Sequence, residues 1–159
     1  MDVAELMDRT VETCRPNDTL AAAAGVMWRK DVGCLPVVGD DGNVIAMVTD
    51  RDICMAAYIQ GRPLDDIPVS VAMSRDLHTC RPNEGLIEAE EIMRQRQVRR
   101  LPVLGTDGLL VGIISLNDIA REAERQIGRK GRQVSPQEVA VTLAAVCAPR
   151  GLRALSMSP

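Results

Sequence analysis

Two pairs of residues in this chain have the types and the spacing that a nucleotide-binding junction requires. Thr49 precedes Asp52 by three residues, and Ser115 precedes Asp118 by the same interval. Each pair follows an apolar run that predicts a buried strand and lies at the start of a predicted helix. Because the amides and the positive dipole end of a helix N-terminus attract anions, the hydroxyl could donate to a phosphate. The carboxylate could accept hydrogen bonds from a ribose diol.

The same pattern also has a purely structural interpretation. A hydroxyl followed three residues later by a carboxylate is a variant of the capping box, in which both side chains satisfy amides of their own helix. Taken singly, neither pair distinguishes nucleotide binding from helix capping. The elements that surround the two pairs must therefore decide between the interpretations.

The two junctions are equivalent points of an internal repeat. A shift of 66 residues places Thr13–Asn17 on an identical sequence at Thr79–Asn83. Between residues 3–57 and 69–123 no gap is needed, and 21 of the 55 positions are identical. Two copies of one supersecondary unit pack most simply around a pseudo-twofold axis, and such packing creates two related clefts.

Each copy is predicted to fold as β-α-β-β-α, so the chain is assigned to the α/β class. Proline ends the first extended piece, the residues Asn17-Asp18 and Asn83-Glu84 are expected to cap the first helices, and Asp-Gly turns reverse the hairpins. The expected elements are extended pieces at Val11–Cys14 and Leu77–Cys80, first helices at Leu20–Lys30 and Leu86–Arg96, strand pairs at Cys34–Val38 with Val44–Val48 and at Arg100–Leu104 with Leu110–Ile114, and second helices from Asp50 to about Ile59 and from Leu116 to about Ile127.

The domain organisation follows from the repeat. We expect residues 1–60 to form the first unit, 61–68 a linker, 69–127 the second unit, and 128–159 a basic loop with a C-terminal helical tail. A serine cap at Ser135, followed by proline, predicts a last helix through Val139–Cys147. This helix is apolar nearly all round, so the body of the protein or a partner subunit must cover it.

Composition narrows the functional classes. No apolar stretch is long enough to span a bilayer and the acidic N-terminus is no signal peptide, so we expect a cytoplasmic protein without a membrane partner. Five widely spaced cysteines without a C-x-x-C motif, together with a single histidine, His78, argue against metal binding and disulfides. Residues 121–159 hold seven basic and three acidic side chains, but they lack the aromatic residues that single-strand binding uses, which makes nucleic acid an unfavoured partner.

The combination of these motifs resembles a pair of CBS domains. The diagnostic pieces are Leu35-Pro36-Val37-Val38 followed by Thr49-Asp50-Arg51-Asp52 in the first copy, and Arg100-Leu101-Pro102-Val103 followed by Ser115-Leu116-Asn117-Asp118 in the second. The resemblance covers residues 3–123. It implies a Bateman module, a disc of two units with two clefts for adenosine-containing ligands, which usually pairs face to face as a homodimer.

The resemblance also implies individual roles. By matching position, Asp52 and Asp118 would hold ribose hydroxyls, and Thr49 and Ser115 would contact phosphate. Arg100 matches a basic residue that faces phosphate in the nucleotide-binding subunit of AMP-activated protein kinase. The full set of implied ligand-binding residues is Thr10, Val11, Thr13, Cys34, Pro36, Thr49, Arg51, Asp52, Asp76, Leu77, Thr79, Arg100, Pro102, Ser115 and Asp118, of which the extended residues before each first helix would line the base.

The two clefts are expected to be chemically unequal. The first copy has Cys34 where the second has Arg100, and the second has Asn117 where the first has Arg51. The family commonly has glycine at the position of Ala46, so the first cleft is expected to be tighter.

The leading hypothesis is a regulatory sensor that binds AMP, ADP, ATP or a related ligand such as NAD and signals to a protein partner. The alternative is a structural dimerisation module with empty or degenerate clefts. An enzyme is not expected, and neither is a catalytic cofactor, because His78 has no repeated acid–base partner and the chain has no room for a catalytic barrel.

Overall fold

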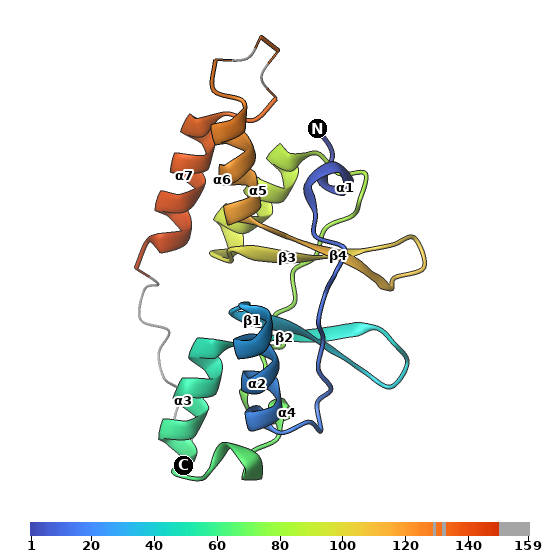
Figure 1. The fold of residues 1–159 in the computed structure, drawn as a ribbon, viewed down its shortest axis with the longest axis vertical. Coiled ribbons are helices and arrows are strands. Elements are labelled where there is room, and N and C mark those ends of the chain that lie inside the picture. Colours follow the sequence, from blue (N-terminus) through green and yellow to red (C-terminus); the bar gives the residue numbers. More distant parts are fainter. Residues whose placement is uncertain (129, 132, 150–159) are drawn as a thin grey trace.

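The computed structural model describes residues 1–128, 130–131 and 133–149. It contains two similar units, one above the other in Figure 1, each built on a two-stranded antiparallel hairpin. The hairpins lie towards the middle of the molecule, and the main helices of each unit lie towards its outer ends. The expected α/β architecture of two repeated units with an additional C-terminal helix is therefore confirmed.

The hairpins match the predicted strands closely. Strand β1 (Cys34–Val38) pairs with β2 (Val44–Thr49), and β3 (Arg100–Leu104) pairs with β4 (Leu110–Ser115). Both turns reverse at an Asp-Gly pair whose glycine has a φ of 82°, a conformation that side chains with a Cβ rarely adopt. The strands end at the hydroxyl residues Thr49 and Ser115, which places both junctions at equivalent corners of the two hairpins.

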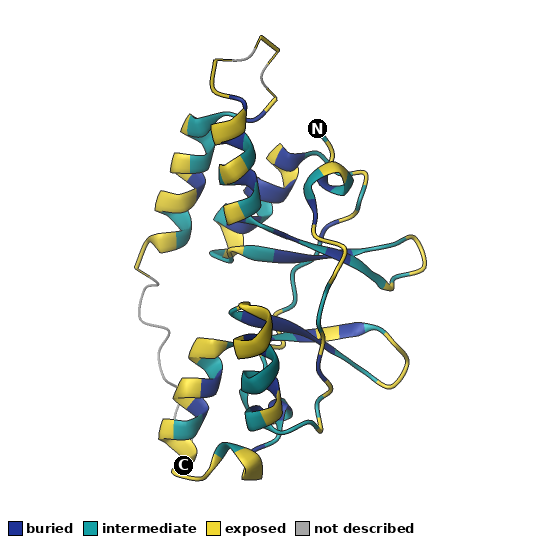
Figure 2. Ribbon diagram, viewed as in Figure 1, coloured by how far each residue is buried: buried dark blue, intermediate teal, exposed yellow. Residues whose placement is uncertain are grey.

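The long helices also begin and end close to the predicted positions. They are α2 (Leu20–Lys30) and α3 (Asp50–Gln60) in the first unit, and α5 (Leu86–Arg96) and α6 (Leu116–Arg125) in the second. Each pair covers its hairpin and encloses an aliphatic core (Figure 2). Among the helices of the described residues, none is long and apolar enough to cross a lipid bilayer.

The predicted caps of the first helices are wrong. The residue that caps α2 is Thr19, whose hydroxyl accepts a hydrogen bond from the Ala22 amide at 3.1 Å. Asp18 instead turns back and accepts from the Arg15 amide at 2.7 Å, so its carboxylate is engaged before the helix begins. In the second unit Gly85 is the N-cap, and its amide donates to the Glu88 carboxylate at 2.8 Å.

The short helix at the start of each repeat packs in the core of the other unit. Helix α1 (Val3–Leu6) places Val3 in the core of the second unit, whereas α4 (Val69–Ala72) places Val69 in the core of the first. The one-turn helix η1 (Leu64–Asp66) precedes α4. Ile67 follows η1 and packs with Val69 in the core of the first unit. Val69 therefore belongs to the second repeat in sequence but to the first unit in packing.

Two extended segments cross between the units as a result of this exchange. The Asp8 amide and carbonyl pair with Ile113 on β4, while Cys14 pairs with Pro36 and Val38 on β1. In the same way Ser74 pairs with Met47 on β2, and Cys80 pairs with β3. The predicted first strand of each unit is therefore reduced to one bridging cysteine, since the residues before it are stretched from one hairpin to the other.

The C-terminal helix α7 (Pro136–Cys147) is attached to the second unit only, against α5 and α6 (Figure 1). Its buried Thr142 hydroxyl donates to Glu90 Oε1 at 3.2 Å, and both residues are almost fully buried. The Gln97 side chain donates to the carbonyls of Ala145 and Ala148, each at 3.2 Å, and so holds the C-terminal end of the helix. The body of the protein thus covers one side of this apolar helix.

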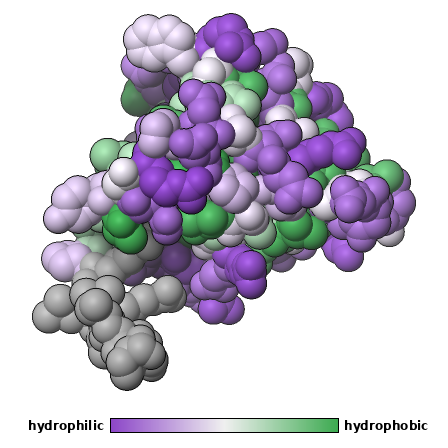
Figure 3. Space-filling view, turned by 90° about the horizontal axis from the view of Figure 1, so that it is seen from below, coloured by the Kyte–Doolittle hydropathy of each residue, from purple (hydrophilic) through white to green (hydrophobic). Residues whose placement is uncertain are grey.

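The outer end of the first unit has a mixed surface. Seen from that end (Figure 3), hydrophobic residues lie in separate patches among hydrophilic ones. Tyr58 and Ile59 on α3 are 82% and 70% exposed, which is unusual for the large apolar residues of a chain with so few aromatics.

Candidate functional site

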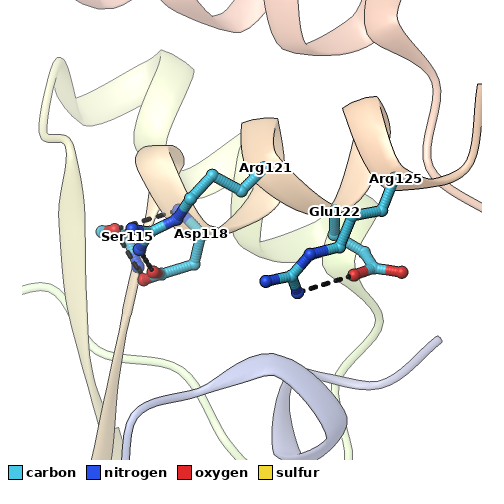
Figure 4. A network of polar contacts seen from close by, with 5 residues as sticks. All are labelled: Ser115, Asp118, Arg121, Glu122 and Arg125. Carbon is cyan, nitrogen blue, oxygen red and sulfur yellow. Dashed lines mark hydrogen bonds and ion pairs between the residues drawn. The ribbon is translucent and has the colours of Figure 1, made fainter.

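Both strand-to-helix junctions form complete capping boxes with nearly the same geometry. Asp52 Oδ2 accepts from the Thr49 amide at 2.9 Å and from the Thr49 hydroxyl at 2.7 Å, while the Asp52 amide donates to that hydroxyl oxygen at 3.2 Å. The equivalent distances between Ser115 and Asp118 are 3.0, 2.6 and 3.2 Å (Figure 4). In both units the hydroxyl–carboxylate pair therefore caps its helix, and this capping uses one oxygen of each carboxylate.

The other carboxylate oxygen differs between the two junctions. Asp118 Oδ1 accepts from Arg121 Nη2 at 2.5 Å, an ion pair one helical turn along α6 (Figure 4). The first unit has Met55 at the position of Arg121, and Asp52 Oδ1 has no hydrogen-bond partner in the described part of the chain. The first junction therefore presents an available acceptor, whereas the second is closed by its own arginine.

Charges from both units meet near Cys34, at the start of β1. Burial raises the pKa of the Cys34 thiol, the charge of Arg100 lowers it, that of Asp50 raises it and that of Arg99 lowers it. The charges of Arg99 and Arg100 of the second unit thus act on Cys34, which pairs with Thr49 of the first-unit junction. Arg51, in the first turn of α3, is exposed, and its amide donates to the Asp50 carboxylate at 2.7 Å.

The crossing segments carry the residues that were expected to line the base. Thr10, Val11 and Thr13 lie on the first segment, between its pairing with β4 and its pairing with β1. Asp76, Leu77 and Thr79 occupy the equivalent stretch of the second, where Asp76 Oδ1 lies 3.3 Å from His78 Nε2. The fold thus places both groups between the two hairpins, with side chains that are exposed or half-buried.

Pro36 and Pro102 lie deeper than the other expected residues. Both are buried within their strands, and their carbonyls accept from the amides of Cys14 and Cys80 at 3.1 Å. Their carbonyls fix the crossing segments to the hairpins, and their buried rings lie within the strands. Burial also raises the pKa of the Cys14 thiol to about 11 and that of Cys80 to about 12, as suits small core residues.

Sequence reasoning missed three charged residues at the junctions. Asp50, Arg99 and Arg121 were given no role, although Arg121 lies at the i+3 spacing from Asp118 that favours a helical ion pair. Asp50 and Arg99 lie far apart in the sequence, so only the packing of the two units could bring them together.

Two hairpin-and-helix units, related by a pseudo-twofold axis and carrying equivalent hydroxyl–carboxylate junctions, define a class of paired regulatory modules. The family model of the CBS domain matches residues 3–58 and again residues 65–125. The chain therefore belongs to the CBS domain family and contains two CBS domains in tandem.

Relatives and solved structures agree with this assignment. The CBS domain-containing protein YhcV of Bacillus subtilis is 42% identical over 118 residues, 74% of this chain and 82% of that protein. The crystal structure of Hypoxic Response Protein I with two coordinated zinc ions has a TM-score of 0.69 at 32% identity, covering 76% of this chain and 98% of that one. The CBS domain pair of protein MJ0100, solved with 5-methylthioadenosine and S-adenosyl-L-methionine, has a TM-score of 0.72 at 21% identity, covering 79% and 98%.

Proposed function

We propose that this protein is a cytoplasmic, non-catalytic sensor that binds an adenosine-containing ligand between its two CBS domains and signals occupancy to a protein partner. The observation that carries the proposal is the first junction. Asp52 presents a free carboxylate oxygen at the N-terminus of α3, near arginines that come from both units. A carboxylate suited to a ribose diol and cations suited to phosphate are the two chemistries that a nucleotide requires.

The arginines favour a phosphorylated ligand. Charge-assisted hydrogen bonds from guanidinium to phosphate are among the strong polar interactions in proteins, and Arg51 and Arg100 belong to different units. We propose that a phosphate placed between them draws the units together, so that occupancy changes the arrangement of the whole module. AMP, ADP, ATP and NAD all carry the required groups. The ligands of the MJ0100 domain pair, two adenosine derivatives, support the same ligand class.

Thermal unfolding with a panel of ligands tests this proposal. A ligand present at 100 times its Kd stabilises the native state by about 2.7 kcal/mol. AMP, ADP, ATP and NAD should therefore raise the midpoint of unfolding, and adenosine should raise it less because it cannot engage the arginines. The proposal fails if no adenosine compound shifts the midpoint and none co-purifies with the protein under native conditions.

A dimerisation module without a ligand is the second candidate. It is favoured by the complete capping boxes, since Thr49, Asp52 and their counterparts already have a structural role without any ligand. In either case we propose that the protein is a homodimer, because the apolar helices of the module leave surface that a single chain does not cover. Light scattering at micromolar concentration should then give about twice the chain mass of 17.3 kDa.

A further inference from the structure

The first unit has an open groove between helices α2 and α3. Its volume is about 350 Å³, and its lining includes Ala24, Met27, Trp28, Asp31, Val32 and Ile53. Trp28 is 88% exposed at its edge. A groove with an apolar floor and an exposed indole is a surface that a partner can cover favourably.

The internal repeat indicates what kind of element fits this groove. A shift of 66 residues places Ala24 on Glu90 and Asp31 on Gln97. These are the two residues of α5 that hold α7, through Thr142 and through the last carbonyls of the helix. The groove is therefore the counterpart of a surface that already holds a helix in the second unit. Ala24 replaces one polar contact with a methyl group, whereas Asp31 and Asp50 place carboxylates at the exposed edge of the groove. The groove therefore suits a helix whose face is apolar beside Ala24 and carries no negative charge.

Helix α7 presents such a face on its other side. Its outward residues are exposed and uncharged, and they are Ala140, Val141, Leu143, Ala144 and Cys147. Val141 and Leu143 are 57% and 48% exposed. The only ionisable carboxylate of the helix, Glu138, lies in its first turn. An uncharged helical face of this kind is rarely left in water, and among the described residues none covers the groove or this face of the helix.

We propose that the outward face of α7 docks into the α2/α3 groove of a second copy of this chain. Helix α7 lies at the left of the second unit in Figure 1, and α3, which forms one wall of the groove, lies at the left of the first. A twofold axis that lies in the plane of this side and crosses the long axis of the molecule brings each α7 opposite the partner's groove, so one closed interface covers all four surfaces. This inference rests on the proposed homodimer and is independent of nucleotide binding.

The natural cysteines allow a direct test. Among the described cysteines, Cys54 on α3 and Cys147 on α7 are exposed, whereas Cys14, Cys34 and Cys80 are buried. Cys54 occupies the repeat position of Ala120 on α6, beside the helical pair that carries α7. A mixture of unlabelled and ¹⁵N-labelled chains is treated with a short bismaleimide, and the cross-linked peptides are identified by mass spectrometry. The proposal expects mixed-isotope links between Cys54 and Cys147. Exclusive Cys54–Cys54 or Cys147–Cys147 links between chains would overturn it.

Charge variants give an independent readout. Leu143→Glu on α7 and Ala24→Glu in the groove should each reduce the native mass from that of a dimer to that of a monomer. Ile87→Glu, at an exposed position of α5 outside both surfaces, is the matched control and should remain dimeric. Circular dichroism checks that each variant is folded. If wild type is a dimer and both charged variants remain dimeric, the α7–groove interface is refuted while the proposed dimer stands. If wild type is monomeric at every concentration, both are refuted.

Discussion

At the scale of single residues, Asp52 and Asp118 perform the same capping task but differ in what remains available. One oxygen of each carboxylate satisfies the start of its helix. The second oxygen of Asp118 is paired with Arg121, whereas that of Asp52 has no hydrogen-bond partner among residues 1–128, 130–131 and 133–149. The ion pair is partly exposed, and such pairs contribute little to stability, so its larger effect is on access to the carboxylate.

Replacing the two carboxylates separately tests their roles. Asp52→Ala should abolish nucleotide binding at the first junction, because the ribose loses its acceptor, whereas Asp118→Ala should leave that binding unchanged. Both variants should also lose about 0.5–2 kcal/mol of stability through the damaged caps. Isothermal titration calorimetry measures the affinity and urea denaturation the stability. Equal stability losses with unaltered affinity in both variants would leave only the capping role.

The arginine of the second junction can be exchanged for its counterpart. Arg121→Met gives the second unit the residue found at position 55 and frees Asp118 Oδ1, so nucleotide binding at the second junction should become tighter or newly detectable. Met55→Arg is the reciprocal variant and should weaken binding at the first junction by placing a competing cation beside Asp52. Calorimetric stoichiometry measures both effects. An Arg121→Met protein with the wild-type stoichiometry and affinity would show that the ion pair does not control access.

At the scale of elements, the sequence predicted the helices and strands that local patterns specify. It missed the short helices whose formation depends on packing against the other unit. The Asp-Gly turns and helical periodicity were sufficient to locate β1, β3, α2 and α5. Helices α1 and α4 have only four residues each, too few for a periodic pattern, and the core that buries them belongs to the other repeat. The residues of the candidate site show the same difference between local sequence and packing of the units. Its repeated carboxylates could be identified, but the proximity of Arg99 to Cys34 depends on how the units pack.

The corrected cap of α2 can be verified by substitution. Thr19→Ala removes the hydroxyl that accepts from the Ala22 amide and should lower the free energy of unfolding by about 1 kcal/mol. Asn17→Ala is the matched control, because Asn17 belongs to the predicted cap Asn17-Asp18 but lies inside the turn that Arg15 and Asp18 close, and it is exposed. The free energy of unfolding of Asn17→Ala, measured by urea denaturation, should be almost the same as that of wild type. The opposite ranking of the two variants would restore Asn17 as the capping residue.

At the scale of the whole molecule, the second unit is closed where the first is open. Arg121 occupies the second junction, and α7 occupies the second helical face. The first unit has Met55 at one of these positions, and at the other a groove that no described helix occupies. We therefore expect the ligand and the partner subunit both to meet the chain at its first unit, so that binding at one can affect the other through α3.

The attachment of α7 should depend on pH. Burial raises the pKa of Glu90, Glu138 raises it further, and the contact with Thr142 and the charge of Arg94 oppose this. Because the folded-state pKa lies above the ordinary value of 4.5, protonated Glu90 stabilises the fold fully below that value, and this stabilisation is lost as pH rises through the folded-state pKa.

Glu90→Gln should remove this dependence and raise the unfolding midpoint at pH 7, because the amide keeps an acceptor for Thr142 without a buried charge. Thermal unfolding of wild type and variant across pH 4 to 8 measures the difference. A variant as pH-dependent as wild type, or less stable at pH 7, would show that Glu90 is accommodated as a carboxylate.

The exchange of α1 and α4 makes the two halves of the chain mutually dependent for folding. A cut in the exposed connection at Gly61-Arg62-Pro63 would give two fragments, each lacking a helix that its own core needs and carrying the one that the other needs. Such fragments should reassemble when mixed. An ancestral chain with a single repeat could have closed its core only by trading this helix with a second copy, as in a domain-swapped dimer. Fusion of two such genes would keep this exchange of helices within one polypeptide.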